Sequence, residues 1–208
     1  MQWQVEALTA AQQEIDALPV GLQADLRAYV GFTMAEPEVR AHGDLVRDTW
    51  DVIAKRRTTQ PGPPTLTVHR TWLVGRASGR TALLLGFQAG GAPDPGAAYF
   101  PGQAVAAELA YFPAAWPQRA LVVGGAEPAG ASPMPTGTTV SGLLDAYADG
   151  LAAQPWLERV PALLDAVVPI AHEGAWFVCD AAGEALPLGG PAPWGLVARS
   201  GGHPVALA

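Results

Sequence analysis

Hydrophobic and polar positions along residues 65–123 follow the pattern of successive β-strands. Four runs rich in β-branched, leucine or aromatic residues are each bounded by Gly, Pro, Asp or Ser, which is typical of antiparallel strands joined by turns. The predicted strands cover residues 65–74, 80–87, 103–112 and 118–123. We therefore expect a central antiparallel β-meander, with the flanking segments packed on it.

Residues 1–57 instead show the periodicity of helices. Segments 5–18 and 21–32 each repeat apolar residues on one helical face, and Pro19 separates them. A third helix is predicted over 36–55, and it can begin at Glu36-Pro37 because proline is tolerated in the first turn of a helix. Its apolar stripe comprises Val39, His42, Val46, Trp50 and Ile53. The pattern predicts an N-terminal three-helix unit.

The last third of the chain mixes both periodicities. An amphipathic helix is predicted over 138–153, and residues 155–159 are predicted to lead into a shorter helix that ends near residue 166. Strands are then predicted at 167–171, 175–179, 184–188, 196–198 and 205–207. The fold class is therefore α+β. We divide the chain into a helical unit at 1–57, an antiparallel sheet at 64–126, and a helix-and-strand part at 138–208 that packs with the sheet as one domain.

Composition narrows the class of protein. Half of the 208 residues are hydrophobic, which predicts a globular chain. The net charge of −7, with Lys55 as the single lysine, argues against a broad contact with nucleic acid or anionic membrane. Cys179 is the single cysteine, which excludes an internal disulfide and a cysteine-based zinc site. The N-terminus lacks the features of a signal peptide, so we expect a cytoplasmic location and no membrane span.

Catalytic motifs are hard to find in this sequence. It contains no Gly-x-Ser-x-Gly elbow, His-Glu-x-x-His pair, P-loop or dinucleotide fingerprint. We expect a chain that is not an enzyme and that uses no cofactor or metal. A weaker alternative is a hydrolase-like enzyme in which His172 or His203 supplies a base, if the fold brings either one close to an acid.

A short segment between the third and fourth predicted strands is the best candidate for partner binding. It holds two prolines and three aromatic residues, which indicates a rigid corner. Rigid aromatics with a nearby arginine are enriched at binding hot spots. The predicted contact residues are Tyr111, Phe112, Trp116 and Arg119. The alternative interpretation is that Trp116 only caps the sheet.

Four arginines support a rival function, nucleic-acid binding. Arg56 and Arg57 follow Lys55 in the densest positive run of the chain, and Arg76 and Arg80 flank a predicted hairpin turn. They could contact phosphates while aromatic residues stack on bases. The alternatives are a favourable placement of cations at a helix C-terminus and arginines that serve only solubility.

Several blocks of this chain resemble the C-terminal region of bacterial SWIM zinc-finger family proteins. They keep their order and span nearly the whole chain: ALPVGLQADLR at 17–27, HRTWLVGRASGR at 69–80, AELAYFP at 107–113, WPQRALV at 116–122, QPWLER at 154–159 and SGGHPV at 200–205. The zinc finger that names the family is a Cys-x-Cys…Cys-x-His arrangement. A chain with Cys179 alone cannot form it, so zinc binding is not implied here.

The resemblance also suggests a kind of partner. Some members of the family resemble components of systems that contain MoxR-type ATPases or von Willebrand A domains, which implies work on other proteins. The rigid aromatic corner, combined with the absence of catalytic motifs, favours a non-catalytic protein-interaction module as the leading hypothesis. The oligomeric state stays open.

Overall fold

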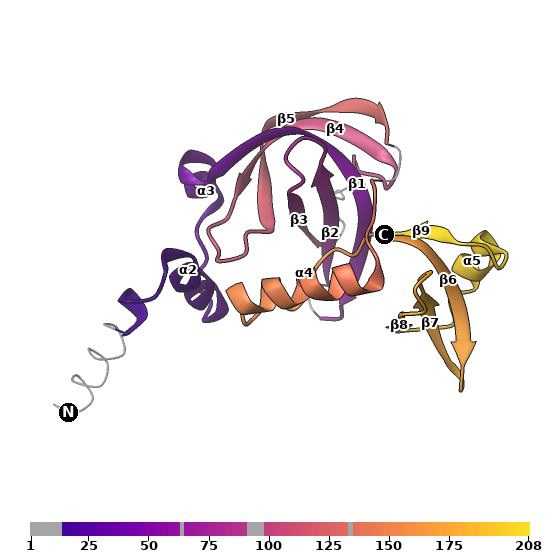
Figure 1. Cartoon of the computed structure of the whole chain (residues 1–208). Helices are drawn as coiled ribbons and strands as arrows, with labels where there is room; N and C mark the ends of the chain where they lie inside the picture. The colour runs from indigo at the N-terminus through magenta and orange to yellow at the C-terminus, as the bar shows by residue number, and fades with distance from the viewer. Residues whose placement is uncertain (1–13, 63–64, 91–97, 133–134) are drawn as a thin grey trace.

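A closed five-stranded barrel is the centre of the molecule, and helices and a second small sheet surround it (Figure 1). The computed structural model describes residues 14–62, 65–90, 98–132 and 135–208. Both helices and sheets are present, so the α+β class is confirmed. In the described part of the chain, no helix is long and apolar enough to cross a membrane.

The longest strand, β1 (Asp44–Gln60), lies where the third helix was expected. That prediction holds only for α3 (Glu36–His42) and is wrong beyond it. Val46 and Trp50 are four residues apart, a spacing that places two side chains on one face of either a helix or a strand. The chain is extended here because β1 pairs antiparallel with β4 along its first half and with β2 along its second half.

The four predicted strands of the centre are confirmed as β2 (Leu66–Gly75), β3 (Thr81–Ala89), β4 (Gln103–Tyr111) and β5 (Arg119–Ala131). Their order is not that of a simple meander, since β3 neighbours β5 rather than β4. The β3–β5 pair is parallel and joins Leu83 to Arg119 and Leu84 to Ala120. Pairing of β1 with β4 then closes the barrel, which removes the exposed strand edges that an open sheet would have.

Large side chains from several strands fill the barrel. Trp50 is fully buried, and its indole Nε1 donates to the carbonyl of Ala107 at 3.0 Å. Its ring lies 6.5 Å from that of Tyr111, centroid to centroid. The rest of this core is apolar and comprises Val52, Leu73, Ala82, Val105, Ala107, Leu109 and Ala120.

Two N-terminal helices pack outside the barrel. The second predicted helix is confirmed as α2 (Val20–Tyr29), whereas the first falls mainly outside the described residues, of which 14–16 are helical. Val39 of α3 is fully buried in a second core cluster with Phe112 and Leu121. This cluster holds α3 against β5, so the predicted three-helix unit does not form.

The C-terminal part begins with α4 (Val140–Ala153), which confirms the predicted amphipathic helix. Thr139 caps it by accepting a hydrogen bond from Gly142 N at 3.1 Å. The shorter helix expected to end near residue 166 is wrong: residues 155–163 are not helical, because Pro161 cannot continue a helix interior. Strand β6 (Leu164–His172) starts there instead.

A second sheet has the order β8-β7-β6-β9. Its other strands are β7 (Ala175–Cys179), β8 (Ala185–Leu188) and β9 (Val205–Leu207), all predicted. The strand expected at 196–198 is wrong, since these residues belong to α5 (Trp194–Ser200). Pro193 precedes this helix and Gly201 ends it in a left-handed conformation, as is common at helix termini.

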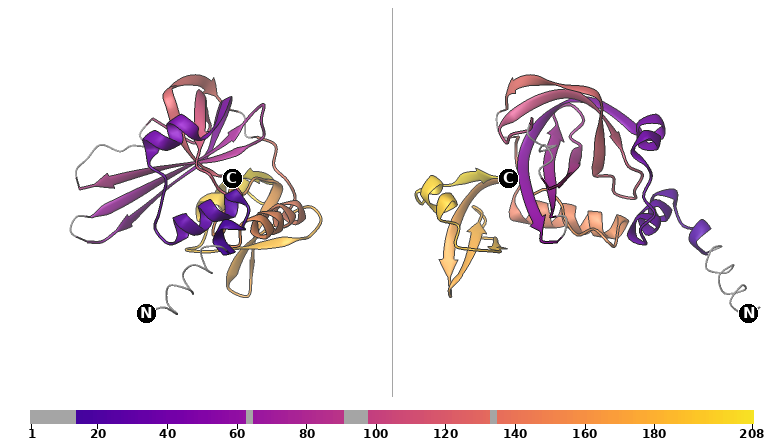
Figure 2. Two further views of the ribbon diagram at one scale, coloured as in Figure 1. Left: turned by 90° about the vertical axis from the view of Figure 1, so that its left-hand side faces the viewer. Right: turned by 180° about the vertical axis from the view of Figure 1, so that it is seen from behind.

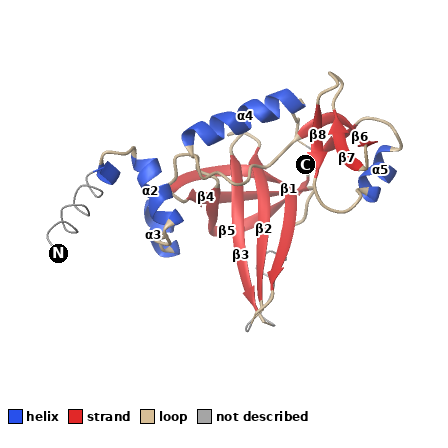
Figure 3. Cartoon of the chain, turned by 90° about the horizontal axis from the view of Figure 1, so that it is seen from below, coloured by secondary structure: helices blue, strands red, loops and turns tan. Residues whose placement is uncertain are grey.

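Helix α4 connects the second sheet with α2 along one side of the barrel (Figures 2 and 3). At its start, the Asp180 carboxylate that follows β7 accepts a hydrogen bond from Val140 N at 3.0 Å. At its end, Gln154 donates from Nε2 to Asp25 of α2 at 3.0 Å. Both ends of α4 are therefore fixed by carboxylates from distant parts of the chain.

Candidate functional site

A groove with a volume of about 790 Å³ lies between α2, the outer face of β2 and β3, the corner that joins β4 to β5, and the segment after α4. Proteins bind ligands in pockets of about 300–1,000 Å³ with mainly apolar walls. The residues that define the groove in the following argument are Asp25, Arg70, Trp72, Leu83, Phe112, Trp116, Gln118, Arg119 and Trp156.

The corner between β4 and β5 forms one wall of the groove. Backbone hydrogen bonds fix its two ends: Phe112 N donates to Arg119 O at 2.9 Å, and Leu83 N donates to Gln118 O at 2.7 Å. Helix α2 packs on the corner at a glycine, because a Cβ on Gly21 would lie 2.7 Å from the Cα of Ala115. The corner is therefore held at both ends by hydrogen bonds to the barrel, and α2 is closely fitted to it.

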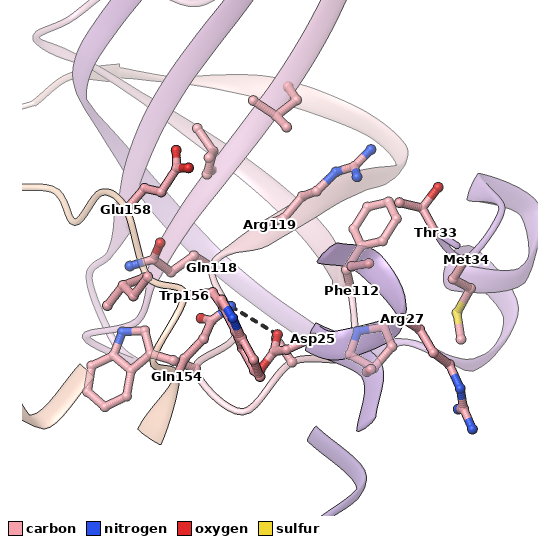
Figure 4. A pocket seen from close by; sticks show the side chains of 18 of the residues that line it. Asp25, Arg27, Thr33, Met34, Phe112, Gln118, Arg119, Gln154, Trp156 and Glu158 are labelled. Atoms are coloured by element: carbon pink, nitrogen blue, oxygen red, sulfur yellow. Dashed lines mark hydrogen bonds between the residues drawn. The ribbon is translucent and has the colours of Figure 1, made fainter. Parts of the chain in front are cut away.

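Asp25 joins three segments at the bottom of the groove. Its carboxylate accepts a hydrogen bond from Ala115 N at 2.9 Å and another from Gln154 Nε2 at 3.0 Å (Figure 4). Burial raises the pKa of Asp25, and the hydrogen bond from Ala115 opposes that shift. This carboxylate thus holds α2, the corner and the end of α4 together.

Aromatic side chains supply most of the apolar surface. Trp72 lies opposite Leu83 across the β2–β3 pair, on the outer face of the barrel. Trp116 packs near Gly150 of α4, where an added Cβ would come within 3.5 Å of its ring. Trp156 is 38% exposed at the rim, and its ring lies 5.9 Å from that of Tyr29. The groove therefore offers three indoles from three separate segments.

Two buried hydrogen-bond donors line this apolar surface. Gln118 is only 9% exposed, and its Nε2 has no hydrogen-bond partner within the described ranges. The same is true of Nε of Arg119. The Arg119 guanidinium lies 4.0 Å from the centroid of the Phe112 ring. Burial lowers the pKa of Arg119, while the negative charge of Glu36 opposes that shift.

The groove brings together three of the four residues predicted to bind a partner: Phe112, Trp116 and Arg119. The structure places Tyr111 elsewhere, because neighbouring side chains on a strand point to opposite faces. Tyr111 is 1% exposed inside the barrel. Its hydroxyl donates to Thr81 O at 2.9 Å, and the Arg80 guanidinium covers its ring at 3.9 Å. Its side chain is therefore not presented to a partner.

Two of the four arginines of the nucleic-acid hypothesis form ion pairs with carboxylates, and the other two lie exposed near the end of one strand. Arg76 forms an ion pair with Asp51, with Nη2 and Oδ1 2.8 Å apart. Arg80 forms one with Asp44 at 2.5 Å. Arg56 and Arg57 are exposed near the end of β1, where Arg56 lies opposite Arg70 on β2.

The histidines of the enzyme hypothesis lie at two separate turns. His172 is exposed at the end of β6, with its Nε2 4.0 Å from the carboxylate of Glu173. His203 is exposed in the turn between α5 and β9. Among residues 14–62, 65–90, 98–132 and 135–208, no group of three or more His, Cys, Asp or Glu side chains could hold a metal ion.

Comparison with family models, with curated proteins and with solved structures finds no match to this chain. The resemblance to SWIM zinc-finger proteins therefore stays a prediction. The function has to be argued from the groove itself.

Sequence reasoning missed several residues of the groove. Asp25 and Gln118 were not selected, although Asp25 is a charged residue flanked by the apolar Ala24 and Leu26. Trp72 was noted only within a predicted strand, Trp156 only in the segment before a predicted helix, and both within blocks of the family resemblance. No signal in the sequence relates these segments to one another, because they meet only when the barrel closes and α4 crosses its side.

The buried phenol of Tyr111 leads to a prediction on alkaline stability. Burial raises the pKa of Tyr111 to about 12, while the phenol in the unfolded chain ionises near 10. The Tyr111 phenol keeps its proton to a higher pH in the folded state than in the unfolded state. The stability that the neutral phenol contributes is therefore complete below pH 10 and is lost as the pH rises toward 12. Urea unfolding at several pH values between 9 and 11.5 should show this loss.

The Tyr111→Phe variant is the control for that experiment. It lacks the hydrogen bond to Thr81 and should be less stable at pH 9 by about 0.5–1.5 kcal/mol. Its stability should then fall less steeply above pH 10 than that of the unmodified chain. Equal slopes in the two proteins would contradict the assignment of the shift to Tyr111.

Proposed function

We propose that this chain is a non-catalytic protein-interaction module that binds an apolar segment of a partner protein in the groove. The observation that carries the proposal is the groove itself, in which Phe112, Trp116 and Trp156 line the same pocket as Gln118 and Arg119. Tryptophan, tyrosine and arginine dominate the energetics of protein interfaces when they lie in well-packed pockets.

The rim of the groove also supports a docking role. Val20, Phe32 and Trp156 line it and are exposed. Large apolar side chains that gather around a concave surface mark interaction sites more often than they mark ordinary surface. Their removal from water on binding supplies a favourable free energy. A role as the accessory region of a SWIM-type protein, with a MoxR-type ATPase or von Willebrand A domain as partner, is part of this proposal.

Affinity capture from a lysate of the source cell tests the proposal, with the chain as bait. Trp156→Ala removes an exposed indole from the rim, and Trp194→Ala removes an exposed indole outside the groove. Loss of a hot-spot residue weakens binding by about 2 kcal/mol or more, which is roughly 30-fold. We therefore expect Trp156→Ala to lose a protein partner that Trp194→Ala and the unmodified chain retain.

Equal capture by all three baits would contradict the groove as the docking site. Each capture should also be repeated after nuclease treatment. A protein partner that survives nuclease supports the proposal, and a partner that disappears with nuclease points to nucleic acid instead.

One observation favours nucleic-acid binding as a second candidate function. The groove lies against β2 and β3, and five-stranded barrels of the oligonucleotide-binding type use those strands for their ligands. Arg70 and Trp72 lie on this face, and Arg56 is the cross-strand neighbour of Arg70. Binding of this kind would fall steeply with salt concentration. The net charge of −7 makes it the second choice.

A further inference from the structure

We infer that the partner segment bound in the groove carries a carboxylate that pairs with Arg119, while a backbone carbonyl of the same segment accepts from Gln118. This inference rests on the proposed function, because it specifies the chemistry of the segment. The ligand class is an apolar peptide with one acidic residue.

Arg119 provides the first reason. Its side chain is partly buried and stacks on Phe112, with the guanidinium carbon 4.0 Å from the ring centroid. In the part of the chain that the structure describes, no carboxylate lies within ion-pair distance of it, and the negative charge of Glu36 acts on it only from farther away. A charge taken out of water without a partner is unfavourable. A carboxylate is the group whose geometry fits a guanidinium best, through two parallel hydrogen bonds.

Gln118 provides the second and independent reason. It is more than nine-tenths buried, its side chain lines the groove, and its covered Nε2 has no acceptor in the described residues. Its backbone is fixed by the hydrogen bond from Leu83 N, so the strand register determines its position. Buried donors in folded proteins are nearly always paired. The terminal torsion of a glutamine side chain turns easily, and rotation of the amide toward the groove would let a bound carbonyl satisfy this donor.

The positions of these donors favour a peptide over a small carboxylic acid. Figure 4 shows the Arg119 guanidinium beside Phe112, and the Gln118 amide on the other side, toward Glu158. The negative charge of Glu158 disfavours a second carboxylate near Gln118, so the neutral acceptor belongs there and the charged one beside Arg119. An extended peptide presents carbonyls along its whole length with side chains between them, and it can satisfy both donors while its apolar groups contact Trp72 and Trp116.

A peptide-display selection on the full chain tests this inference. The probes are random peptides of about ten residues, and each selected acidic peptide is resynthesised with Asn or Gln in place of Asp or Glu. We expect selected peptides to contain apolar residues and an acidic residue. The amide counterparts should bind at least about tenfold more weakly, in keeping with the strength of charge-assisted hydrogen bonds.

Variants of the chain assign the effect to residues. Arg119→Gln should lower the affinity for the acidic peptide by about tenfold and leave the affinity for its amide counterpart unchanged. Unchanged binding of the amide peptide also shows that the variant is folded. Gln118→Leu should weaken both peptides, by about twofold to tenfold. Arg57→Gln is the matched control, since Arg57 is exposed outside the groove and should change nothing.

The outcomes separate the two proposals. The selection could yield apolar peptides that bind the unmodified chain but not Trp156→Ala and that show no preference for an acidic residue. This result would overturn the inference but would still support the interaction module. The same holds if Arg119→Gln and Arg57→Gln bind the acidic peptide equally well. If no peptide is selected, or if every selected peptide binds Trp156→Ala as well as the unmodified chain, both the interaction module and the inference are overturned.

Discussion

Replacing Trp50 with alanine is expected to lower the free energy of unfolding by about 3–5 kcal/mol, the usual cost of truncating a buried tryptophan. Trp50 is 0% exposed at the centre of the barrel. The substitution leaves a large cavity beside Tyr111 and removes the indole partner of the Ala107 carbonyl. Urea unfolding followed by circular dichroism measures the change.

Trp194→Ala is the matched control for this experiment. Trp194 is 66% exposed, and its ring packs against that of Trp176 with the centroids 5.5 Å apart. Loss of that aromatic pair should cost about 0.5–1.5 kcal/mol. If both variants lost the same amount, the barrel interior would not be the part of the molecule that determines its stability.

Gly21→Ala is expected to destabilise the fold by about 1–3 kcal/mol, the range for overpacked sites. Alanine is the better helix former, so helix propensity alone predicts a gain of about 1 kcal/mol. A steric contact nevertheless makes the net change in stability unfavourable. The new Cβ would lie 2.7 Å from Cα and 2.8 Å from N of Ala115, and these backbone atoms cannot move aside as a flexible side chain can. Helix α2 must therefore shift away from the corner.

Gly195→Ala tests the same chemical change without the contact. Both glycines are the second residue of their helix, and a Cβ on Gly195 would have no neighbour within 4 Å. This variant should keep or increase stability, by up to about 1 kcal/mol. Because Asp25 lies on α2, Gly21→Ala should also weaken partner capture, whereas Gly195→Ala should not. The opposite order of stability would refute the close fit of α2 to the corner.

The strands of the barrel were largely predictable from the sequence, because β-branched runs bounded by turn residues identify them locally. The closure of the barrel was not. Whether β3 pairs with β4 or with β5 depends on contacts between residues 83 and 119, and no local pattern encodes a pairing over that separation. The prediction of a helix in place of β1 was wrong for a different reason. The spacing of Val46 and Trp50 fits the periodicity of a helix and that of a strand, and only the pairing of β1 with β2 and with β4 decides in favour of the strand.

The groove was predictable only in part. Its rigid corner is visible in the sequence because prolines and aromatics are adjacent there. The partners of the corner are not visible, since Asp25 and Gln154 are far apart in the chain and become neighbours through α4. Tyr111 and Phe112 could have been separated by strand alternation, which sends one side chain inward and the next outward.

The parallel contact between β3 and β5 has a consequence for how binding and folding are linked. Only two residue pairs hold this contact, Leu83 with Arg119 and Leu84 with Ala120, whereas long antiparallel ladders hold the other strands. Leu83 and Arg119 also line the groove. A ligand seated there would contact both strands of this short junction, and a site built from both strands requires the junction to be closed. Occupancy of the groove therefore opposes local opening of the barrel, and the gain in stability increases with the concentration of free ligand relative to its dissociation constant.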